Sequence, residues 1–420
     1  MRILLETISD YIWGNGMIVL LLCAGLLCTV RTKCIQLKLP GFIFRTIRER
    51  SLGKDQLKIV CTSLGAAMGT GNITGVSAAL LTCGPGAVFW MWISAFLGMA
   101  LVYTENVLSS IYSSSKVKGS IAYIRYGLNS RILACLFSIF CCGTACTMGG
   151  FVQVNSVVQT FEASGISARM IIAVLSFFLI IAVITGGADR IRMTAQFALP
   201  FVSVLYLLIC MIVIIRFRCN IVDSLKSIFV SAFGIKQAAG GIFGHTLSRI
   251  ISTGLRRGIF SNEAGLGSSP LLHSDAEMKS ISDQGMWAMA EVFTDTIICC
   301  TITALTILCS DKDMSVITSF SSVLRQYTAP MLACILSVFA FCTVIGWYYC
   351  GEKAFLYLTG GKHSKSAAYI FAVLASAGTL FSASDAWMLS DIFNGLMAIP
   401  NIIAVFLLSP HILSDRQTEL

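Results

Sequence analysis

Two glycine-rich segments contain the residues best suited to bind a small charged solute. Residues 65–75 include Asn72, residues 258–267 include Asn262, and both segments lie inside apolar stretches. Each glycine destabilises a helix by about 1 kcal/mol relative to alanine, so these clusters predict helices that unwind and restart. Such a break leaves free N–H groups on one half-helix and free carbonyls on the other. The N–H groups suit a carboxylate, and the carbonyls suit a cation such as Na⁺.

Acidic residues follow both segments at the same interval. Glu105 lies 33 positions after Asn72, and Asp295 lies 33 positions after Asn262. An ionisable residue within an apolar span indicates a functional site by default. The alternatives are that the glycines only allow close helix packing and that Glu105 lies near enough to one end to be solvated.

Three further polar residues lie near the second glycine segment. Glu263 is expected to pair with Arg256 or Arg257 and stabilise the break. Glu291 is another acid inside an apolar stretch. His273 is expected near the cytoplasmic end, where a lone histidine is more often structural than a proton relay.

The composition requires a membrane around these residues. Of the 420 residues, 56% are hydrophobic and 12% are charged, whereas a soluble domain has about 25% charged residues. This excludes a soluble enzyme and a nucleic-acid-binding protein, so the net charge of +9 indicates no nucleic-acid partner. Windows of about 20 apolar residues predict roughly eleven crossings. They are 12–30, 59–83, 86–112, 133–160, 168–187, 194–215, 240–275, 284–309, 330–350, 367–383 and 386–409.

The distribution of positive charge predicts the orientation. The segment 31–58 has eight Lys and Arg residues and is therefore assigned to the cytoplasm, as an amphipathic loop. The N-terminus is then outside and, after eleven crossings, the C-terminus is cytoplasmic. In this arrangement 19 of the 30 Lys and Arg residues lie in cytoplasmic segments.

The spans divide into a first helix and two sets of five. We assign 1–58 to the extra helix and its loop, 59–215 to repeat 1 and 226–409 to repeat 2, all within one transmembrane domain, 1–420. Each glycine segment then falls in the first span of its repeat, and the odd number of spans gives the repeats opposite orientations. Paired interrupted helices in inverted repeats are typical of secondary transporters. The residues alone therefore predict a cation-coupled carrier of a small polar, zwitterionic solute.

Three motifs resemble those of the alanine/glycine:cation symporter family, the sodium:alanine symporters. They cover much of the chain: Gly69–Val76 with Gly84–Trp92, Arg257–Pro270, and Phe339–Glu352. The resemblance implies an all-α polytopic membrane protein with a LeuT-type fold, one extra N-terminal helix preceding two inverted five-helix units. It also implies sodium-coupled uptake of alanine or glycine by alternating access across the plasma membrane, with Na⁺ as the coupling ion. We expect it to function as a monomer in the lipid bilayer.

The resemblance also implies roles for particular residues. The carboxylate of the amino acid is expected near Thr70, Gly71 and Asn72, and its amino group near Phe260. The pocket is completed by side chains from two other spans, Gln153, Thr343 and Trp347. The sodium ligands are expected to be Gly65, Met68 and Thr343.

Some alternatives remain open from the sequence. Phe260 and Trp347 are also typical core aromatics, and Gln153 is also typical of a hydrogen bond between helices. This chain has Cys342 where the family usually has serine, and a thiol is a poor ligand for a hard cation. A proton-coupled or exchange carrier for another small amino acid is the alternative function. A channel or a membrane-embedded enzyme is disfavoured, because no filter loop, nucleophile motif or metal motif is evident.

Overall fold

The chain folds into helices throughout the part that the structure describes. This computed structural model describes residues 2–49, 54–163, 169–233, 243–275, 280–310, 314–362 and 364–412, and contains no strand within them. A helix satisfies its own backbone hydrogen bonds, which is required where no water is present. The predicted all-α architecture is therefore confirmed.

The helices differ widely in length, from single turns to more than thirty residues. The N-terminal half contains α1 (Arg2–Ile12), α2 (Asn15–Arg31), α3 (Leu39–Glu49), α4 (Lys54–Ala67), η2 (Thr70–Asn72), α5 (Thr74–Cys83), α6 (Gly86–Tyr112), α7 (Ser120–Ala122), η3 (Tyr123–Gly127), α8 (Arg131–Cys146), η4 (Thr147–Phe151), α9 (Val152–Ala163), α10 (Arg169–Ile184) and α11 (Gly187–Arg216). The C-terminal half contains η5 (Arg218–Asn220), α12 (Ile221–Ala232), α13 (Phe243–Asn262), α14 (Ser268–His273), α15 (Ile281–Val292), η7 (Phe293–Cys300), α16 (Thr301–Ser310), α17 (Val316–Leu324), η8 (Arg325–Tyr327), α18 (Thr328–Thr359), α19 (Ser364–Ala377), η9 (Gly378–Leu380) and α20 (Ala383–Leu408).

Seven helical stretches among the described residues are long and apolar enough to span a membrane. They are Ile3–Arg31, Gly86–Tyr112, Arg131–Glu162, Gly187–Arg216, Ile281–Ser310, Val316–Thr359 and Ala383–Leu408. An eighth is the bent pair Val60–Ala67 and Thr70–Cys83. The chain is therefore a multi-pass membrane protein. Two predicted spans correspond to shorter apolar helices, Arg169–Ile184 and Lys365–Leu380, and the span predicted at 240–275 corresponds to α13 and α14.

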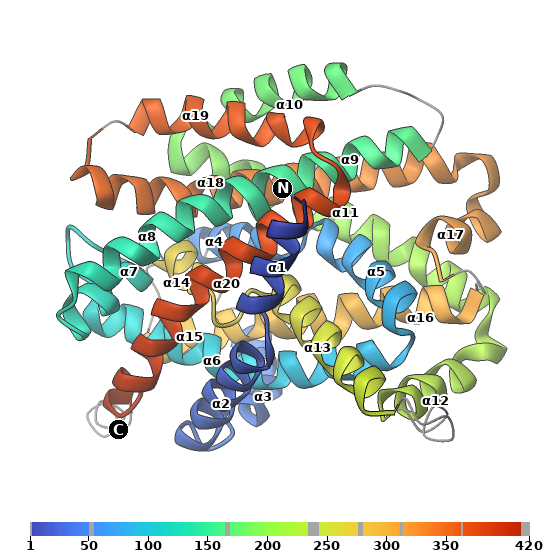
Figure 1. Cartoon of the computed structure of the whole chain (residues 1–420), viewed down its shortest axis with the longest axis horizontal. Coiled ribbons are helices and arrows are strands. Elements are labelled where there is room, and N and C mark those ends of the chain that lie inside the picture. The colour runs from blue at the N-terminus through green and yellow to red at the C-terminus, as the bar shows by residue number, and fades with distance from the viewer. Residues whose placement is uncertain are drawn as a thin grey trace.

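The interrupted helices lie within the bundle, surrounded by longer ones. Helix α4 packs on α11 and α18, and α13 packs on α6. In Figure 1, α7 and α14 lie toward the left of the bundle, whereas α5, α12 and α17 lie toward the right. Met1 and residues 413–420, the two ends for which the sequence predicts opposite sides of the membrane, lie outside the described part.

Candidate functional site

The first glycine segment forms a break between α4 and α5. Helix α4 ends at Ala67, a single 3₁₀ turn covers Thr70–Asn72, and α5 begins at Thr74 with a bend of 53° across the break. Gly69 is extended, with φ −121° and ψ −155°. Thr70, Gly71 and Asn72 are all buried. The structure thus shows the predicted interruption, with the backbone of α4 and α5 meeting inside the protein.

Three of the predicted substrate residues surround this break. Gln153 Oε1 accepts hydrogen bonds from the Thr70 backbone N–H at 3.3 Å and from its hydroxyl at 2.9 Å. Thr343 on α18 donates its hydroxyl to the Gly65 carbonyl at 3.1 Å. A Cβ on Gly69 would lie 2.5 Å from Thr343 Oγ1 and 3.2 Å from Gln153 Oε1. Glycine is therefore required for these two side chains to meet the backbone.

The second glycine segment separates α13 from α14. Helix α13 ends at Asn262 and α14 begins at Ser268. Glu263 (φ +57°), Gly265 (φ +85°) and Gly267 (φ +76°) all have positive φ between them. Glycine adopts this conformation readily, but a glutamate held in it is strained.

Glu263 faces α14 and α18 rather than an arginine. Its carboxylate accepts a hydrogen bond from Ser268 Oγ at 2.6 Å and one from Trp347 Nε1 at 2.9 Å. The predicted pairing with Arg256 or Arg257 is therefore wrong. The helix ends before Glu263, so the left-handed turn removes this side chain from the α13 face that presents the arginines.

The two arginines contact α20 and the first helices instead. Arg256 Nη1 lies 3.7 Å from Asp391 Oδ2, and its guanidinium lies over the Trp13 ring, 5.6 Å from the centroid. The Arg257 guanidinium lies over Trp387, 4.3 Å from the ring centroid.

Phe260 connects the two breaks. A Cβ on Gly71 would lie 3.2 Å from the Phe260 ring, and the ring centroid is 4.5 Å from that of Trp387. The last turn of α13 therefore packs an aromatic ring directly against the bare backbone of the first break. Phe260 and Gly71, which the resemblance assigned to opposite ends of one substrate, are therefore in contact.

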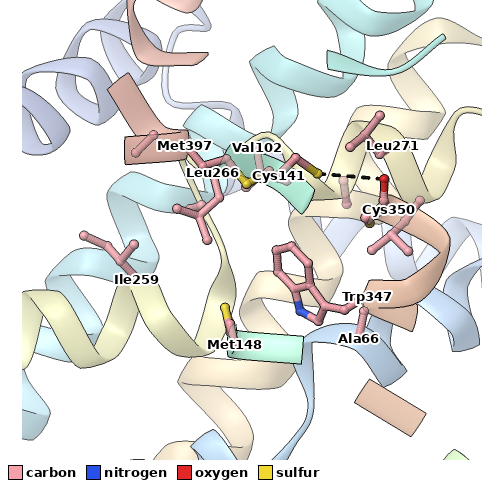
Figure 2. Close-up of a cluster of buried hydrophobic side chains, with 14 of the residues drawn as sticks. Ala66, Val102, Cys141, Met148, Ile259, Leu266, Leu271, Trp347, Cys350 and Met397 are labelled. Carbon is pink, nitrogen blue, oxygen red and sulfur yellow. Dashed lines mark hydrogen bonds between the residues drawn. The ribbon is translucent and has the colours of Figure 1, made fainter. Parts of the chain in front are cut away.

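Trp347 lies inside the hydrophobic core at the second break. It is 0% exposed, and Figure 2 shows its indole surrounded by buried side chains that include Met148 and Leu266. A Cβ on Gly149 would lie 2.2 Å from Trp347 Cβ, so α18 passes very close to the π-helical turn η4. Trp347 therefore contacts the second break, whereas Thr343, one helical turn earlier, contacts the first.

Asn72 reaches the acid of the other predicted repeat. Its Nδ2 donates to Asp295 Oδ1 at 2.6 Å and to the Asp295 carbonyl at 3.0 Å. Asp295 Oδ2 accepts from Ser261 Oγ at 2.6 Å and from Thr296 Oγ1 at 2.8 Å. Asn72 Oδ1 is buried without a hydrogen-bond partner among the described residues. The sequence singled out Asn72 and Asp295 at matching positions, but nothing in it showed that they meet.

Glu105 occupies a comparable position at the second break. Asn401 Nδ2 donates to Glu105 Oε1 at 2.5 Å and to the Gly265 carbonyl at 2.8 Å. Glu105 is 0% exposed, so it is not the solvated residue that the sequence left possible. Each break thus adjoins a buried acid supplied by the second span of the other predicted repeat.

The predicted sodium ligands lie along the end of α4. The Gly65 carbonyl and the Thr343 hydroxyl are 3.1 Å apart, and Met68 is buried two residues before Thr70. Cys342 is also buried, and a Cβ on Gly65 would lie 3.6 Å from its Cβ. These positions bring oxygen atoms of α4 and α18 together, beside the thiol that replaces the usual serine.

His273 contacts a buried acid, as a structural histidine between helices can. Its Nε2 lies 2.9 Å from Glu291 Oε1, and Glu291 Oε2 accepts from Ser63 Oγ at 2.5 Å. All three side chains are buried. They join α14 to α15 and α4. The first half of one interrupted helix (α4) is therefore connected to the second half of the other (α14).

A cluster of cations surrounds Asp275, just beyond α14. Lys118 Nζ and Lys353 Nζ each lie 2.9 Å from its carboxylate, and Arg192 Nη2 lies 3.2 Å away. Tyr349 also donates its hydroxyl to Asp275. Partial burial would raise the pKa of Asp275, but Lys353 and the hydrogen bonds from Tyr349 and Lys118 hold the pKa well below its usual range. Segments predicted to lie on the same side of the membrane therefore converge on one carboxylate.

Comparisons with known proteins agree with this arrangement. Residues 1–418 match the model of the sodium:alanine symporter family. The chain is 34% identical to the "Sodium/alanine symporter AgcS" of Methanococcus maripaludis over 440 residues, covering 99% of this chain and 96% of that protein. It is 36% identical to the "Probable sodium/glutamine symporter GlnT" of Bacillus subtilis over 420 residues (96% and 87%).

A third relative differs in its named coupling ion. The "Putative sodium/proton-dependent alanine carrier protein YrbD" of Bacillus subtilis is 32% identical over 454 residues, covering 98% of this chain and 91% of that protein. The resemblance inferred from the motifs is confirmed, because the family model and these relatives span almost the whole chain. The chain belongs to the sodium:alanine symporter family, whose members are transporters of amino acids and not enzymes.

Proposed function

We propose that this protein couples the inward movement of Na⁺ to the uptake of a small neutral amino acid, alanine or glycine. The observation that supports this function best is the meeting of two interrupted helices around Phe260 and Gly71. Bare backbone at membrane depth is tolerated only where it is buried in protein or lines a cavity. Here the interrupted backbone supplies a helix N-terminus, which favours an anion, close to a helix C-terminus, which favours a cation.

The substrate fits between these ends as a zwitterion. Helix α5 begins at Thr74, so its N-terminal N–H groups and dipole favour the carboxylate, assisted by Thr70, Gly71 and Asn72. Helix α13 ends at Asn262, so its free carbonyls beside Phe260 favour the ammonium group. Gln153 holds Thr70, and Thr343 adjoins Gly69, which places both at the edge of the same site.

The bulk around the breaks favours a short side chain. Phe260 touches Gly71, and Trp347 is packed against Gly149 and hydrogen-bonded to Glu263. Both aromatics reduce the space available to anything larger than a methyl group. The relative whose printed name is a glutamine symporter shows that other amino acids belong in the same test.

Two places offer oxygen ligands for the coupling ion. Asp295 is the stronger, since its carboxylate is buried and the hydroxyl oxygens of Ser261 and Thr296 lie within hydrogen-bonding distance of it. None of the partners described for Asp295 carries a positive charge, so a bound cation would supply the missing counter-charge. The second place is the predicted set of Gly65, Met68 and Thr343. In both, Na⁺ is transported cargo bound by oxygen atoms.

Alternating access then requires the bundle to open at each end in turn. We propose the LeuT-type arrangement, eleven spans with inverted repeats at 59–215 and 226–409 after an extra first helix. The N-terminus is then outside and the C-terminus cytoplasmic in the plasma membrane, and the monomer functions alone. The Asp275 cluster and the His273–Glu291–Ser63 contacts close the predicted cytoplasmic end, and inward opening must break them.

Proton coupling is the second candidate. Asp295, Glu105 and Glu263 are fully buried carboxyl groups whose described hydrogen-bond partners are neutral. Such groups can bind a proton as readily as a metal ion. A relative named as sodium/proton-dependent belongs to the same family.

The test is uptake of radiolabelled alanine, glycine and glutamine into proteoliposomes under a sodium gradient, a proton gradient or neither. We expect alanine or glycine to accumulate with sodium, and labelled alanine to exchange against internal alanine in counterflow. Accumulation that persists when choline replaces sodium but needs a proton gradient would establish the second candidate. Flux without counterflow would contradict a carrier and indicate a channel.

A further inference from the structure

A basic cavity opens at the end of the molecule where the Asp275 cluster lies. It has a volume of about 540 Å³ and is formed by the loop after α6, the start of α7 and the last turns of α18. Two glycines, Gly360 and Gly361, complete one wall with φ +66° and +83°. A Cβ on either glycine would meet no atom within 4 Å, so the space in front of this wall is empty.

The charge in this cavity is positive. The charged residues that line it are Lys116, Lys118 and Lys353. Lys118 and Lys353 share one carboxylate, Asp275, which also takes Arg192, whereas Lys116 is exposed. Arg192 also lies 3.6 Å from the exposed Asp189. The cations of the cavity and its border, Lys116, Lys118, Lys353 and Arg192, therefore outnumber the two carboxylates, and an additional anion would be attracted.

Two further arginines act electrostatically on a residue that lines the cavity. Arg125 in η3 and Arg131 at the start of α8 both interact electrostatically with Tyr357, which lines the cavity. They extend the positive region from α18 toward α8. Lysine and arginine together provide several N–H donors for the oxygen atoms of a phosphate group.

The cavity also has an apolar wall. Val117, Ile121 and Leu356 line it beside the lysines. The residues that directly follow Arg125, Arg131 and Tyr357 in the chain are apolar and exposed: Tyr126 at 46%, Ile132 at 75% and Leu358 at 37%. A free phosphate ion gains nothing from such a wall, but a phospholipid has an apolar stem that does.

We propose that this cavity binds the phosphate-bearing headgroup of an anionic phospholipid from the leaflet on its own side of the membrane. The phosphate contacts Lys116 and competes with Asp275 for Lys118 and Lys353. The apolar wall holds the glycerol and upper acyl region. Occupation by lipid therefore weakens the Asp275 cluster.

The test is native mass spectrometry of the detergent-solubilised full chain titrated with phosphatidylglycerol, phosphatidylcholine or inorganic phosphate. We expect phosphatidylglycerol to bind more tightly than phosphatidylcholine, and Lys116→Gln to weaken it about 5-fold, the effect of one lysine near an anionic lipid. Lys116→Arg keeps the charge and should retain binding. Arg48→Gln removes an exposed charge from α3, outside the cavity, and should have little effect.

A second variant moves the result in the opposite direction. Asp275→Asn frees Lys118 and Lys353, so phosphatidylglycerol should bind several-fold more tightly, an outcome that misfolding cannot produce. Equal binding of the two lipids, or an equal loss in Arg48→Gln and Lys116→Gln, would overturn the proposal. Displacement of the lipid by millimolar inorganic phosphate would show an anion site without lipid preference. No change in Asp275→Asn would refute the competition.

Discussion

Two carboxylates at different depths, Asp295 and Asp275, have opposite surroundings. Asp295 is 0% exposed and accepts hydrogen bonds from an amide and two hydroxyl groups, none of them charged. Asp275 is half-buried near the end of the bundle and is shared by two lysines and an arginine. The same side-chain type thus has neutral partners at the breaks and cationic partners at the end.

The difference indicates two separate tasks. A buried carboxylate without a charged partner is costly to keep ionised, so it favours binding of a transported cation or a proton. A carboxylate with three cationic partners is already neutralised, so it serves to hold helices together. We therefore propose ion coupling for Asp295 and closure of the end for Asp275, and the following predictions test this division.

The largest effect is expected for Asp295→Asn. Removing the charge should lower sodium-stimulated uptake by about 100-fold or more. The carboxylate and the bound Na⁺ would form a buried charge pair, and loss of one partner of such a pair costs about 2–5 kcal/mol. The measurement is initial uptake of labelled alanine at several sodium concentrations in proteoliposomes. Asp223→Asn, an exposed acid on α12, is the matched control. Unchanged sodium dependence in Asp295→Asn would transfer ion coupling to the Gly65 and Thr343 region.

Asp275→Asn should loosen closure while leaving sodium dependence intact. We expect efflux of preloaded alanine to rise by about 10-fold, because a partly buried charge pair loses one member. The measurement is efflux with sodium on both sides of the membrane. Tyr349→Phe removes one hydrogen bond to Asp275 and should have a smaller effect. A loss of sodium dependence in Asp275→Asn would break the distinction between the two carboxylates.

The contribution of the Asp275 carboxylate to closure should not depend on pH near neutrality. The pKa of Asp275 is held below its unfolded value of about 3.9, so the stabilisation is fully present above that value and is lost only as pH falls toward the lowered pKa. Efflux through the wild-type protein should therefore show no change attributable to Asp275 between about pH 5 and pH 8. The efflux of Asp275→Asn should therefore exceed that of the wild type by the same factor at every pH in this range. If the difference between the two disappears at some pH within the range, another group controls closure.

Trp347→Ala should change substrate range more than sodium coupling. Removing the indole opens space beside Glu263 and should improve competition by larger amino acids several-fold, as expected when a pocket gains volume. Trp347→Phe keeps most of the bulk and loses the hydrogen bond, so it separates size from polarity. A fixed substrate order in both variants would show that Trp347 only packs the core.

Cys342→Ser should have the smallest effect. A hydroxyl is a better ligand than a thiol for a hard cation, so the half-saturating sodium concentration should fall by about 2- to 5-fold if the Gly65 and Thr343 region binds sodium. Cys342→Ala is the control, since it removes the thiol without adding an oxygen. Identical sodium curves for both variants would leave Asp295 as the supported site.

The sequence predicted the interruptions correctly because their cause is local. Glycine clusters weaken a helix wherever it packs, and the structure breaks at 67–74 and at 262–268 as expected. The family was also recognisable, because two of its motifs, Gly69–Val76 and Arg257–Pro270, lie on these same segments. The pairing of Glu263 was predicted wrongly, since a left-handed turn at one residue redirects its side chain and the sequence does not encode that turn by spacing alone.

By itself the sequence determined that the chain is a multi-pass helical membrane protein with two broken helices. Composition forces burial in lipid, and backbone hydrogen bonding in lipid forces helices. Only the tertiary structure decided which groups meet: Asn72 with Asp295, Trp347 with Glu263, and four separate segments at Asp275. Those contacts join residues far apart in the chain, and helix packing, rather than any local preference, brings them within hydrogen-bonding distance.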